Sequence, residues 1–254
     1  MSSRSKIVRL RNWQPPLDGE QLENLLSEGE IDGGELVPWG SNYTYYVDVR
    51  ADGIGCQAVY KPRRGEAPLM DFPSGTLYLR EQAAYLVSEW LGWNLVPHTV
   101  IRNDAPYGPG TLQIYVEADG PPHVYSLTRE NLSDLERMVL FDIIVNNADR
   151  KPAHCFKGIG HGLWAIDHGL TFHARPKMRT VVWDFCGEPI STPLLSSLRE
   201  ARKDAARVAD LNKRLAPLLA RREIEAYWQR VDDVLERGVF PRLDPRYNIP
   251  YGFA

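Results

Sequence analysis

The chain has 254 residues, of which 43% are hydrophobic and 25% are charged, so it is long enough for one large domain or two lobes with a full core. Its formal net charge of −3 gives no reason to expect bulk nucleic-acid binding, and no apolar run approaches the roughly 20 residues that span a bilayer. The N-terminus has no apolar stretch resembling a secretion signal, and the three cysteines form no CxxC pair, which together predict a cytoplasmic protein without a disulfide scaffold.

The first 120 residues are predicted to form an antiparallel sheet with one long helix. Aromatic and β-branched residues alternate on both sides of Asp52-Gly53, which is typical of a β-hairpin. The run "TLYLREQAAYLVSEWLG" has helix formers throughout and predicts a helix with one packed stripe, ending near Gly92. In chain order we expect a short helix that stops at Gly33-Gly34, the hairpin over 42–62, the long helix, and two strands between 96 and 117.

The second half is predicted to be mostly helical. Ser133 and Glu136 form a capping-box pattern, which predicts the start of a helix that runs to Asn147. Two short strand-like runs, "HCFKG" and "GLWAID", follow, and then two or three amphipathic helices. The segment "VEADGPPHVYS" indicates a hinge. The predicted fold is therefore α+β with two lobes, residues 1–120 carrying the sheet and one helix and residues 121–254 carrying mostly helices.

Four charged residues occur where a ligand between two such lobes would need them. Lys61 ends the second hairpin strand, and Glu81 lies in the first turns of the long helix, within reach of that strand. Asp149 and Asp167 each follow an apolar run and precede residues that turn the chain. Phosphoryl transfer from ATP requires a cation on the α- and β-phosphates, an acid that holds this cation, a carboxylate for the acceptor hydroxyl and another for the metal.

The motifs that contain these residues resemble a known family. "VYKP", "YLREQAAYLVSEWLG", "FDIIVNNADR" and "AIDHGLTF" are similar, in order, to segments of the phosphatidylinositol 3/4-kinase-like branch of the protein-kinase-like fold, over most of residues 35–185. The likeness is greatest to its type II phosphatidylinositol 4-kinase and HipA-like side, and more narrowly to a small actinobacterial family described as phosphatidylinositol 3- and 4-kinases. The resemblance implies a two-lobed kinase-like fold and an ATP-dependent kinase acting on a hydroxyl-bearing lipid, protein or small molecule, and it fixes no substrate.

The resemblance also implies a role for each residue. Lys61 would hold the α- and β-phosphates of ATP, and Glu81 would hold Lys61 in place. Asp149 would orient and deprotonate the acceptor hydroxyl, and Asp167 would bind Mg²⁺ or Mn²⁺. The backbone of Gly40, Ser41 and Asn42 would bind phosphate, and the adenine base would lie against the hinge at Gln113, Tyr115, Val116 and Glu117.

One position departs from the family pattern. That pattern has an asparagine five residues after the catalytic aspartate as a second metal ligand, and in this chain the residue is His154. A neutral imidazole suits Mn²⁺ or Zn²⁺ better than Mg²⁺, which strongly prefers oxygen. His154 is therefore an unusual metal ligand, a phosphate-binding residue or a brace for the loop, or the site has lost one metal. Asp142, on the apolar side of its helix, is expected to anchor the loop, because a buried carboxylate needs donors.

Two other functions are open from the sequence. A nucleotide-binding pseudokinase would also fit a site that lacks the asparagine and has a single glycine in its phosphate loop. A metal-dependent hydrolase would instead use a group of histidine, cysteine and aspartate residues, although none of them follows an HxxxH, CxxC or HExxH spacing. The residues of this rival cluster are His154, Cys155, His161, Asp167, His168 and His173.

Overall fold

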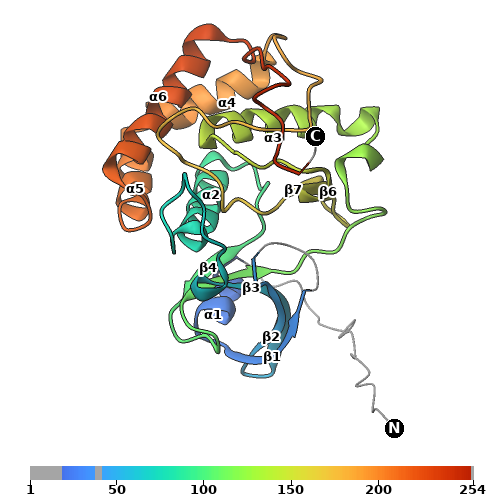
Figure 1. Ribbon diagram of the computed structural model, residues 1–254, viewed down its shortest axis with the longest axis vertical. Helices are drawn as coiled ribbons and strands as arrows, with labels where there is room; N and C mark the ends of the chain where they lie inside the picture. Colours follow the sequence, from blue (N-terminus) through green and yellow to red (C-terminus); the bar gives the residue numbers. More distant parts are fainter. Residues whose placement is uncertain (1–18, 38–41, 253–254) are drawn as a thin grey trace.

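A five-stranded antiparallel sheet forms the first lobe (Figure 1). The computed structural model describes residues 19–37 and 42–252, so the predicted phosphate-loop residues Gly40 and Ser41 lie outside the described residues. The strand order in the sheet is β1-β2-β3-β5-β4, and every neighbouring pair is antiparallel. The strands span Glu30–Leu36 (β1), Tyr45–Ala51 (β2), Ile54–Pro62 (β3), Thr99–Arg102 (β4) and Gly110–Ile114 (β5).

The predicted hairpin is confirmed in β2 and β3. The two strands pair without a gap up to a connection of only two residues, Asp52 and Gly53. Their φ angles are 49° and 78°, and a two-residue type I′ turn requires positive φ at both positions. The turn fixes the register of β2 against β3, and on the other side of β3 Lys61 pairs with Thr111 of β5.

The first helix ends earlier than the sequence predicts. Helix α1 spans Gly19–Glu28, and the N–H of Gly29 donates to the carbonyl oxygen of Leu25 over 2.9 Å. A Cβ at position 29 would lie 2.5 Å from that oxygen, so glycine is required there. The predicted stop at Gly33 and Gly34 is therefore wrong: both glycines lie inside β1, where its register with β2 shifts.

Helix α2, Leu77–Leu91, packs against the C-terminal helices, although it lies between β3 and β4 of the sheet in sequence (Figure 1). It ends where the sequence predicts, at Gly92, whose φ of 67° forms the C-cap. Ala83, Val87 and Trp90 enter a large core that is shared with the helices of the second half. A separate, smaller core lies between α1 and the sheet.

The second half consists of helices and a two-stranded sheet. Its first helix starts at Leu132, so Ser133 lies inside the first turn and the predicted capping box is wrong. The N–H of Thr128 instead donates to the Asn131 side chain, which forms the cap of a short 3₁₀ helix just before it. The remaining elements are α3 (Leu132–Val145), β6 (Cys155–Lys157), β7 (Leu163–Ala165), α4 (Thr192–Lys203), α5 (Ala205–Leu215) and α6 (Arg221–Arg237), with 3₁₀ helices at Arg63–Gly65, Val124–Ser126, Arg129–Asn131 and Pro152–His154.

The α+β fold with two lobes is confirmed. The sheet and α1 lie together at one end of the molecule, and the helices of the second half lie at the other (Figure 1). The predicted hairpin, the two strands after α2 and the amphipathic helices after residue 190 are all present. Among residues 19–37 and 42–252, we find no helix with the length and hydropathy that a membrane span needs.

Candidate active site

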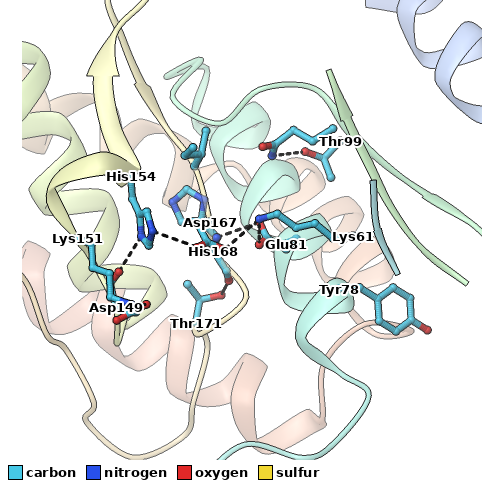
Figure 2. Close-up of polar contacts among 12 residues, drawn as sticks. Lys61, Tyr78, Glu81, Thr99, Asp149, Lys151, His154, Asp167, His168 and Thr171 are labelled. Carbon is cyan, nitrogen blue, oxygen red and sulfur yellow. Dashed lines mark hydrogen bonds and ion pairs between the residues drawn. The ribbon is translucent and has the colours of Figure 1, made fainter. Parts of the chain in front are cut away.

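Lys61 connects β3 with two acidic residues of other elements (Figure 2). Its Nζ donates to Oε1 of Glu81 over 2.6 Å and to Oδ1 of Asp167 over 3.0 Å. The preceding residue, Tyr60, is buried in the small core, so the alternation of the strand turns Lys61 to the opposite face, toward α2. The structure thus brings together three of the four residues that the sequence singles out, and we call Lys61, Glu81 and Asp167 the Lys61 cluster.

Glu81 is held at both of its carboxylate oxygens. Oε1 accepts from Lys61, and Oε2 accepts from the backbone N–H of His168 over 2.9 Å. Burial raises the pKa of Glu81, Lys61 opposes that rise, and the negative charge of Asp167 adds to it. The side chain of Glu81 is 4% exposed whereas that of Asp167 is 44% exposed, so Asp167 is the carboxylate of the cluster that a ligand can reach.

A buried ion pair next to Glu81 fastens α2 to the second lobe. The side chain of Arg80 is 2% exposed, and its Nη2 donates to Oε1 of Glu223, in α6, over 2.7 Å. Its Nη1 donates to the carbonyl oxygen of Thr171 over 2.7 Å. Because Arg80 and Glu81 are consecutive in one helix, this anchor also fixes the position of Glu81 relative to Asp167.

The segment "DHG" runs close to α2. Asp167 has a φ of 62°, a left-handed conformation that aspartate adopts more readily than most residues. A Cβ at Gly169 would lie 3.3 Å from the Cβ of Leu77, so glycine allows the segment to pass close to the helix. Burial acts to raise the pKa of Asp167, but Lys61 and then His154 outweigh it and hold this pKa below its usual range.

The predicted catalytic loop rests on a buried group that we call the loop lock: Asp142, Asn147 and Arg150. The guanidinium of Arg150 donates to both carboxylate oxygens of Asp142, over 2.7 and 2.8 Å. Asn147 donates to Asp142 over 2.9 Å, and its Oδ1 accepts from the N–H of Asp149 over 2.9 Å. Asp142 is fully buried, which confirms the prediction that it anchors the loop.

Asp149 forms an ion pair with Lys151, a residue that the sequence motifs do not single out. The Nζ of Lys151 lies 2.8 Å from Oδ2 of Asp149. Burial raises the pKa of Asp149, and Lys151 opposes that rise. A raised pKa makes a carboxylate a better proton acceptor, which is what a general base needs. Lys151 could have been identified from the sequence, because it lies two residues after the predicted catalytic aspartate in "ADRKP".

His154 lies between the two predicted site aspartates (Figure 2). Its Nδ1 donates to the carbonyl oxygen of Asp149 over 3.0 Å, because a carbonyl can only accept. Its Nε2 faces Oδ2 of Asp167 at 3.2 Å. Burial lowers the pKa of His154, although Asp167 opposes the shift. When the ring is neutral, Nε2 directs its lone pair at a carboxylate oxygen, and two acceptors at this distance require a cation or a proton between them.

The residues predicted to bind the adenine base or a phosphate differ in whether their polar groups already form hydrogen bonds within the protein. Gln113 is buried in β5, and its side chain donates to a threonine of β4. The N–H of Tyr115 donates to β3, and the carbonyl of Glu117 accepts from the turn between β6 and β7. Val116 forms no hydrogen bond with any residue that the structure describes, so its N–H and C=O are unused within that part of the chain. Asn42 uses its Oδ1 to accept the N–H of residue 67.

The rival metal cluster is dispersed in the structure. His161 stacks on Trp164 with ring centroids 3.7 Å apart, and His173 packs against Phe72. Cys155 is buried, and burial raises the pKa of its thiol to about 12. Over residues 19–37 and 42–252, no three His, Cys, Asp or Glu side chains are grouped so that they could hold a metal ion. This arrangement gives the hydrolase hypothesis no support.

Comparisons with known proteins identify one relative by sequence and one by fold. The chain is 36% identical to Protein Rv2133c of Mycobacterium tuberculosis over 262 residues, which cover 89% of this chain and 93% of that protein. Among solved structures it is similar to the proinflammatory kinase CtkA of Helicobacter pylori, with a TM-score of 0.54 and 10% identity over 84% of this chain and 94% of that chain. At this identity the match shows a kinase-like fold and no more. A scan against models of known protein families returns no match.

Proposed function

The chain belongs to the family of Protein Rv2133c, and because its fold is kinase-like we propose that it is an ATP-dependent phosphotransferase. The reaction would move the γ-phosphoryl group of ATP to a hydroxyl group of an acceptor. The observation that carries the proposal is the contact of Lys61 with Glu81 and Asp167, since phosphoryl transfer needs a cation for the phosphates that an acid holds in place, next to a metal-binding carboxylate.

The described residues offer contacts for both ends of ATP. The ammonium group of Lys61 would bind the α- and β-phosphates, and the fixed carboxylate of Glu81 would keep it there. The open N–H and C=O of Val116 would pair with the edge of the adenine base. Within the predicted hinge, Val116 is therefore the strongest candidate, because Tyr115 and Glu117 have each already used one backbone group in the protein.

The residues around Asp167 fit a divalent cation. Nε2 of His154 and Oδ2 of Asp167 lie 3.2 Å apart, and adjacent ligands of an octahedral ion lie about 3 Å apart. These two atoms would hold the ion, with phosphate oxygens and water completing its ligands. The bound ion would neutralise negative charge on the phosphates. Because one ligand is nitrogen, the site would favour Mn²⁺ over Mg²⁺.

Asp149 is the proposed general base. Its carboxylate would accept the proton of the acceptor hydroxyl as the oxygen bonds to the γ-phosphorus and the bond from that phosphorus to ADP breaks. The raised pKa of Asp149, which burial causes, supports this role. Lys151, at 2.8 Å from the carboxylate, would lie close enough to offset negative charge on the transferred group.

The acceptor is proposed by class. The sequence resemblance to phosphatidylinositol kinases favours an inositol lipid, and a protein hydroxyl or a small-molecule alcohol are the alternatives. Transfer of label from γ-labelled ATP to phosphatidylinositol vesicles, to a generic protein substrate and to small polyols, each measured with Mg²⁺ and with Mn²⁺, would identify the class.

Two lysine substitutions, one in the proposed nucleotide site and one at the surface, test this site. Lys61→Met removes the proposed phosphate-binding cation, so stabilisation of the fold by ATP and metal should disappear; at 100 times Kd that stabilisation is about 2.7 kcal/mol. Lys157→Met is the matched control, because Lys157 is half exposed and pairs with Asp119 at the surface. Thermal unfolding with and without ATP measures both variants. An ATP response that Lys61→Met leaves unchanged would contradict the proposal.

A nucleotide-binding pseudokinase is the second candidate. The ion pair between Asp149 and Lys151 favours it, because a carboxylate neutralised in this way is a weaker base unless substrate displaces the lysine. His154 at the position of the expected asparagine favours it as well. ATP binding that depends on Lys61, combined with neither transfer to an acceptor nor hydrolysis of ATP, would select this function.

A further inference from the structure

A groove in the second lobe lies apart from the Lys61 cluster. Two adjoining cavities, of about 290 and 470 Å³, are bounded by the end of α3, by α6 and by the C-terminal segment. Neither Asp149 nor any residue of the Lys61 cluster lines them. The cavities form one groove, which we call the arginine groove, because they share Ile143, Arg230, Pro241 and Arg242.

Positive side chains dominate the arginine groove. Asp233 is its single acidic residue, although the whole chain has more acidic than basic residues and a net charge of −3. The groove is therefore locally positive, although the chain as a whole has a negative net charge. The basic residues that line the groove are Lys177, Arg179, Arg230, Arg237 and Arg242.

Among the described residues, the four arginines of the groove form no hydrogen bond or ion pair with an acidic side chain. Arg179 donates to a tyrosine hydroxyl and a backbone carbonyl, and Arg230 donates to backbone carbonyls. Arg237 and Arg242 form no hydrogen bond or ion pair with the part of the chain that the structure describes. Lys177, by contrast, pairs with a carboxylate at 2.8 Å.

Arg230 is largely buried along the wall that the two cavities share. Its Nη2 is buried and has no hydrogen-bond partner in the described structure. Burial lowers the pKa of its guanidinium to about 10, although Tyr227 and Glu223 oppose the shift. A bound anion would offset this charge, directly or through water.

The wall of the groove continues into the predicted catalytic loop. The N–H of Arg179 donates to the carbonyl oxygen of Asn147 over 3.0 Å, and the N–H of Arg150 donates to the carbonyl oxygen of Arg179 over 3.1 Å. The N–H of Lys177 donates to Oδ1 of Asn146 over 2.8 Å. A ligand held by Arg179 would therefore also restrain the loop that carries Asp149.

We propose that the arginine groove binds a ligand that carries a phosphate group, at a site separate from the nucleotide site and independent of the proposed phosphotransfer. Guanidinium groups bind phosphate through paired N–H donors, and the groove offers several that form no ion pair with a carboxylate in the described structure. The larger cavity has the volume of a small-molecule site, and Ile143, Met178 and Leu243 give it apolar walls. A soluble phosphorylated compound and the headgroup of an anionic lipid share this chemistry.

Inorganic pyrophosphate tests the site in the full chain, by isothermal titration calorimetry at constant ionic strength. We expect one binding event that the double variant Arg237→Ala/Arg242→Ala weakens at least tenfold. Both side chains are exposed and without partners, so their loss leaves the fold intact. Arg221→Ala is the matched control, because Arg221 is exposed on α6, the helix that Arg237 ends, and pairs with Glu225; it should leave the affinity unchanged.

Lys61→Met separates the groove from the nucleotide site. Pyrophosphate binding that persists in Lys61→Met and falls in the double variant supports the proposal. No binding in the wild type, or binding that depends on Lys61 and not on the two arginines, overturns it. Sedimentation with phosphatidylcholine vesicles, with and without phosphatidic acid, distinguishes a lipid headgroup from a soluble ligand. Sedimentation with the acidic vesicles that depends on the two arginines assigns a lipid headgroup. Pyrophosphate binding without such sedimentation assigns a soluble ligand.

Discussion

The Lys61 cluster and the loop lock are each built around one basic side chain, and they differ in how fully its charge is compensated. Arg150 is fully buried and uses all five of its N–H donors on Asp142, on two carbonyl oxygens and on the His168 ring. Lys61 faces two carboxylates, and the one from Asp167 is 44% exposed. In the loop lock, one positive charge is balanced by one negative charge and no side chain is accessible. The Lys61 cluster has two carboxylates for one ammonium group, and one of these carboxylates is accessible.

This difference in charge compensation indicates a structural role for the loop lock and a binding role for the Lys61 cluster. A buried ion pair with every donor used holds one conformation, and nothing further can bind to it. At the edge of the cluster, by contrast, Oδ2 of Asp167 faces Nε2 of the neighbouring His154 at 3.2 Å, and with a neutral ring both atoms are acceptors. A cation completes such a site, so the incomplete group is the one we connect with function.

Breaking the loop lock has the largest expected effect. Arg150→Met leaves the buried carboxylate of Asp142 without its partner, so the free energy of unfolding should fall by about 3–5 kcal/mol. Lys61→Met should cost less, because Asp167 keeps its contact with water and Glu81 can take up a proton. Urea denaturation measures both changes, and equal losses would contradict the comparison.

The second largest effect is expected from weakening the ion pair between Arg80 and Glu223, which anchors α2. Glu223→Gln keeps an oxygen for Arg80 but removes the charge from a buried pair, which should lower the free energy of unfolding by about 1–3 kcal/mol. It should also weaken ATP binding, since Glu81 is then held less firmly. Unfolding with and without ATP measures both effects. Glu225→Gln, an exposed change on the same helix, should produce neither.

His168 should make stability depend on pH. Burial, followed by the positive charge of Arg150, lowers its pKa well below the usual 6.5. The unfolded chain takes up a proton near pH 6.5 and the folded chain does not, so this contribution to stability is complete above that pH. Below it, stability should fall by up to about 1.4 kcal/mol per pH unit. Denaturation between pH 5 and 7.5 gives the slope, and His168→Gln should reduce it; identical slopes would refute the assignment.

The smallest expected effect is at His154. His154→Asn replaces a nitrogen ligand by an oxygen, so the ratio of ATP affinities with Mn²⁺ and Mg²⁺ should move toward Mg²⁺ by about tenfold or less. Calorimetric titration of ATP with each metal at pH 7.5 measures that ratio. If wild type and variant give the same ratio, His154 braces the loop through its hydrogen bond to the Asp149 carbonyl and does not bind metal.

Secondary structure could be predicted where nearby residues determine it. The Asp52-Gly53 turn and the end of α2 at Gly92 depend on backbone conformations that the local residues favour. The end of α1 was missed because the need for glycine at position 29 depends partly on Val49, a residue of β2 that packs against it. The Gly33-Gly34 pair looked like a helix stop, and only the pairing of β1 with β2 reveals a bulge.

The same distinction holds in the site. Lys61, Glu81 and Asp167 could be grouped from the order of their motifs, and the structure places them in contact, while their roles toward ATP and metal stay predictions. Arg80 and Glu223 are 143 positions apart, and no pattern in either segment relates them. The five hydrogen bonds of Arg150 likewise depend on packing, which is why the sequence predicted an anchor at Asp142 but not its full set of partners.

Helix α2 belongs to the large core, whereas the strand that carries Lys61 belongs with the sheet and the small core. The Lys61–Glu81 contact, at 2.6 Å, therefore joins the sheet to a helix of the large core. One side of this contact is fixed, because Arg80 ties α2 to α6, and the other side is the flexible stem of a lysine. If Lys61 binds the phosphates as proposed, this contact would couple nucleotide binding to the position of the sheet relative to the helices.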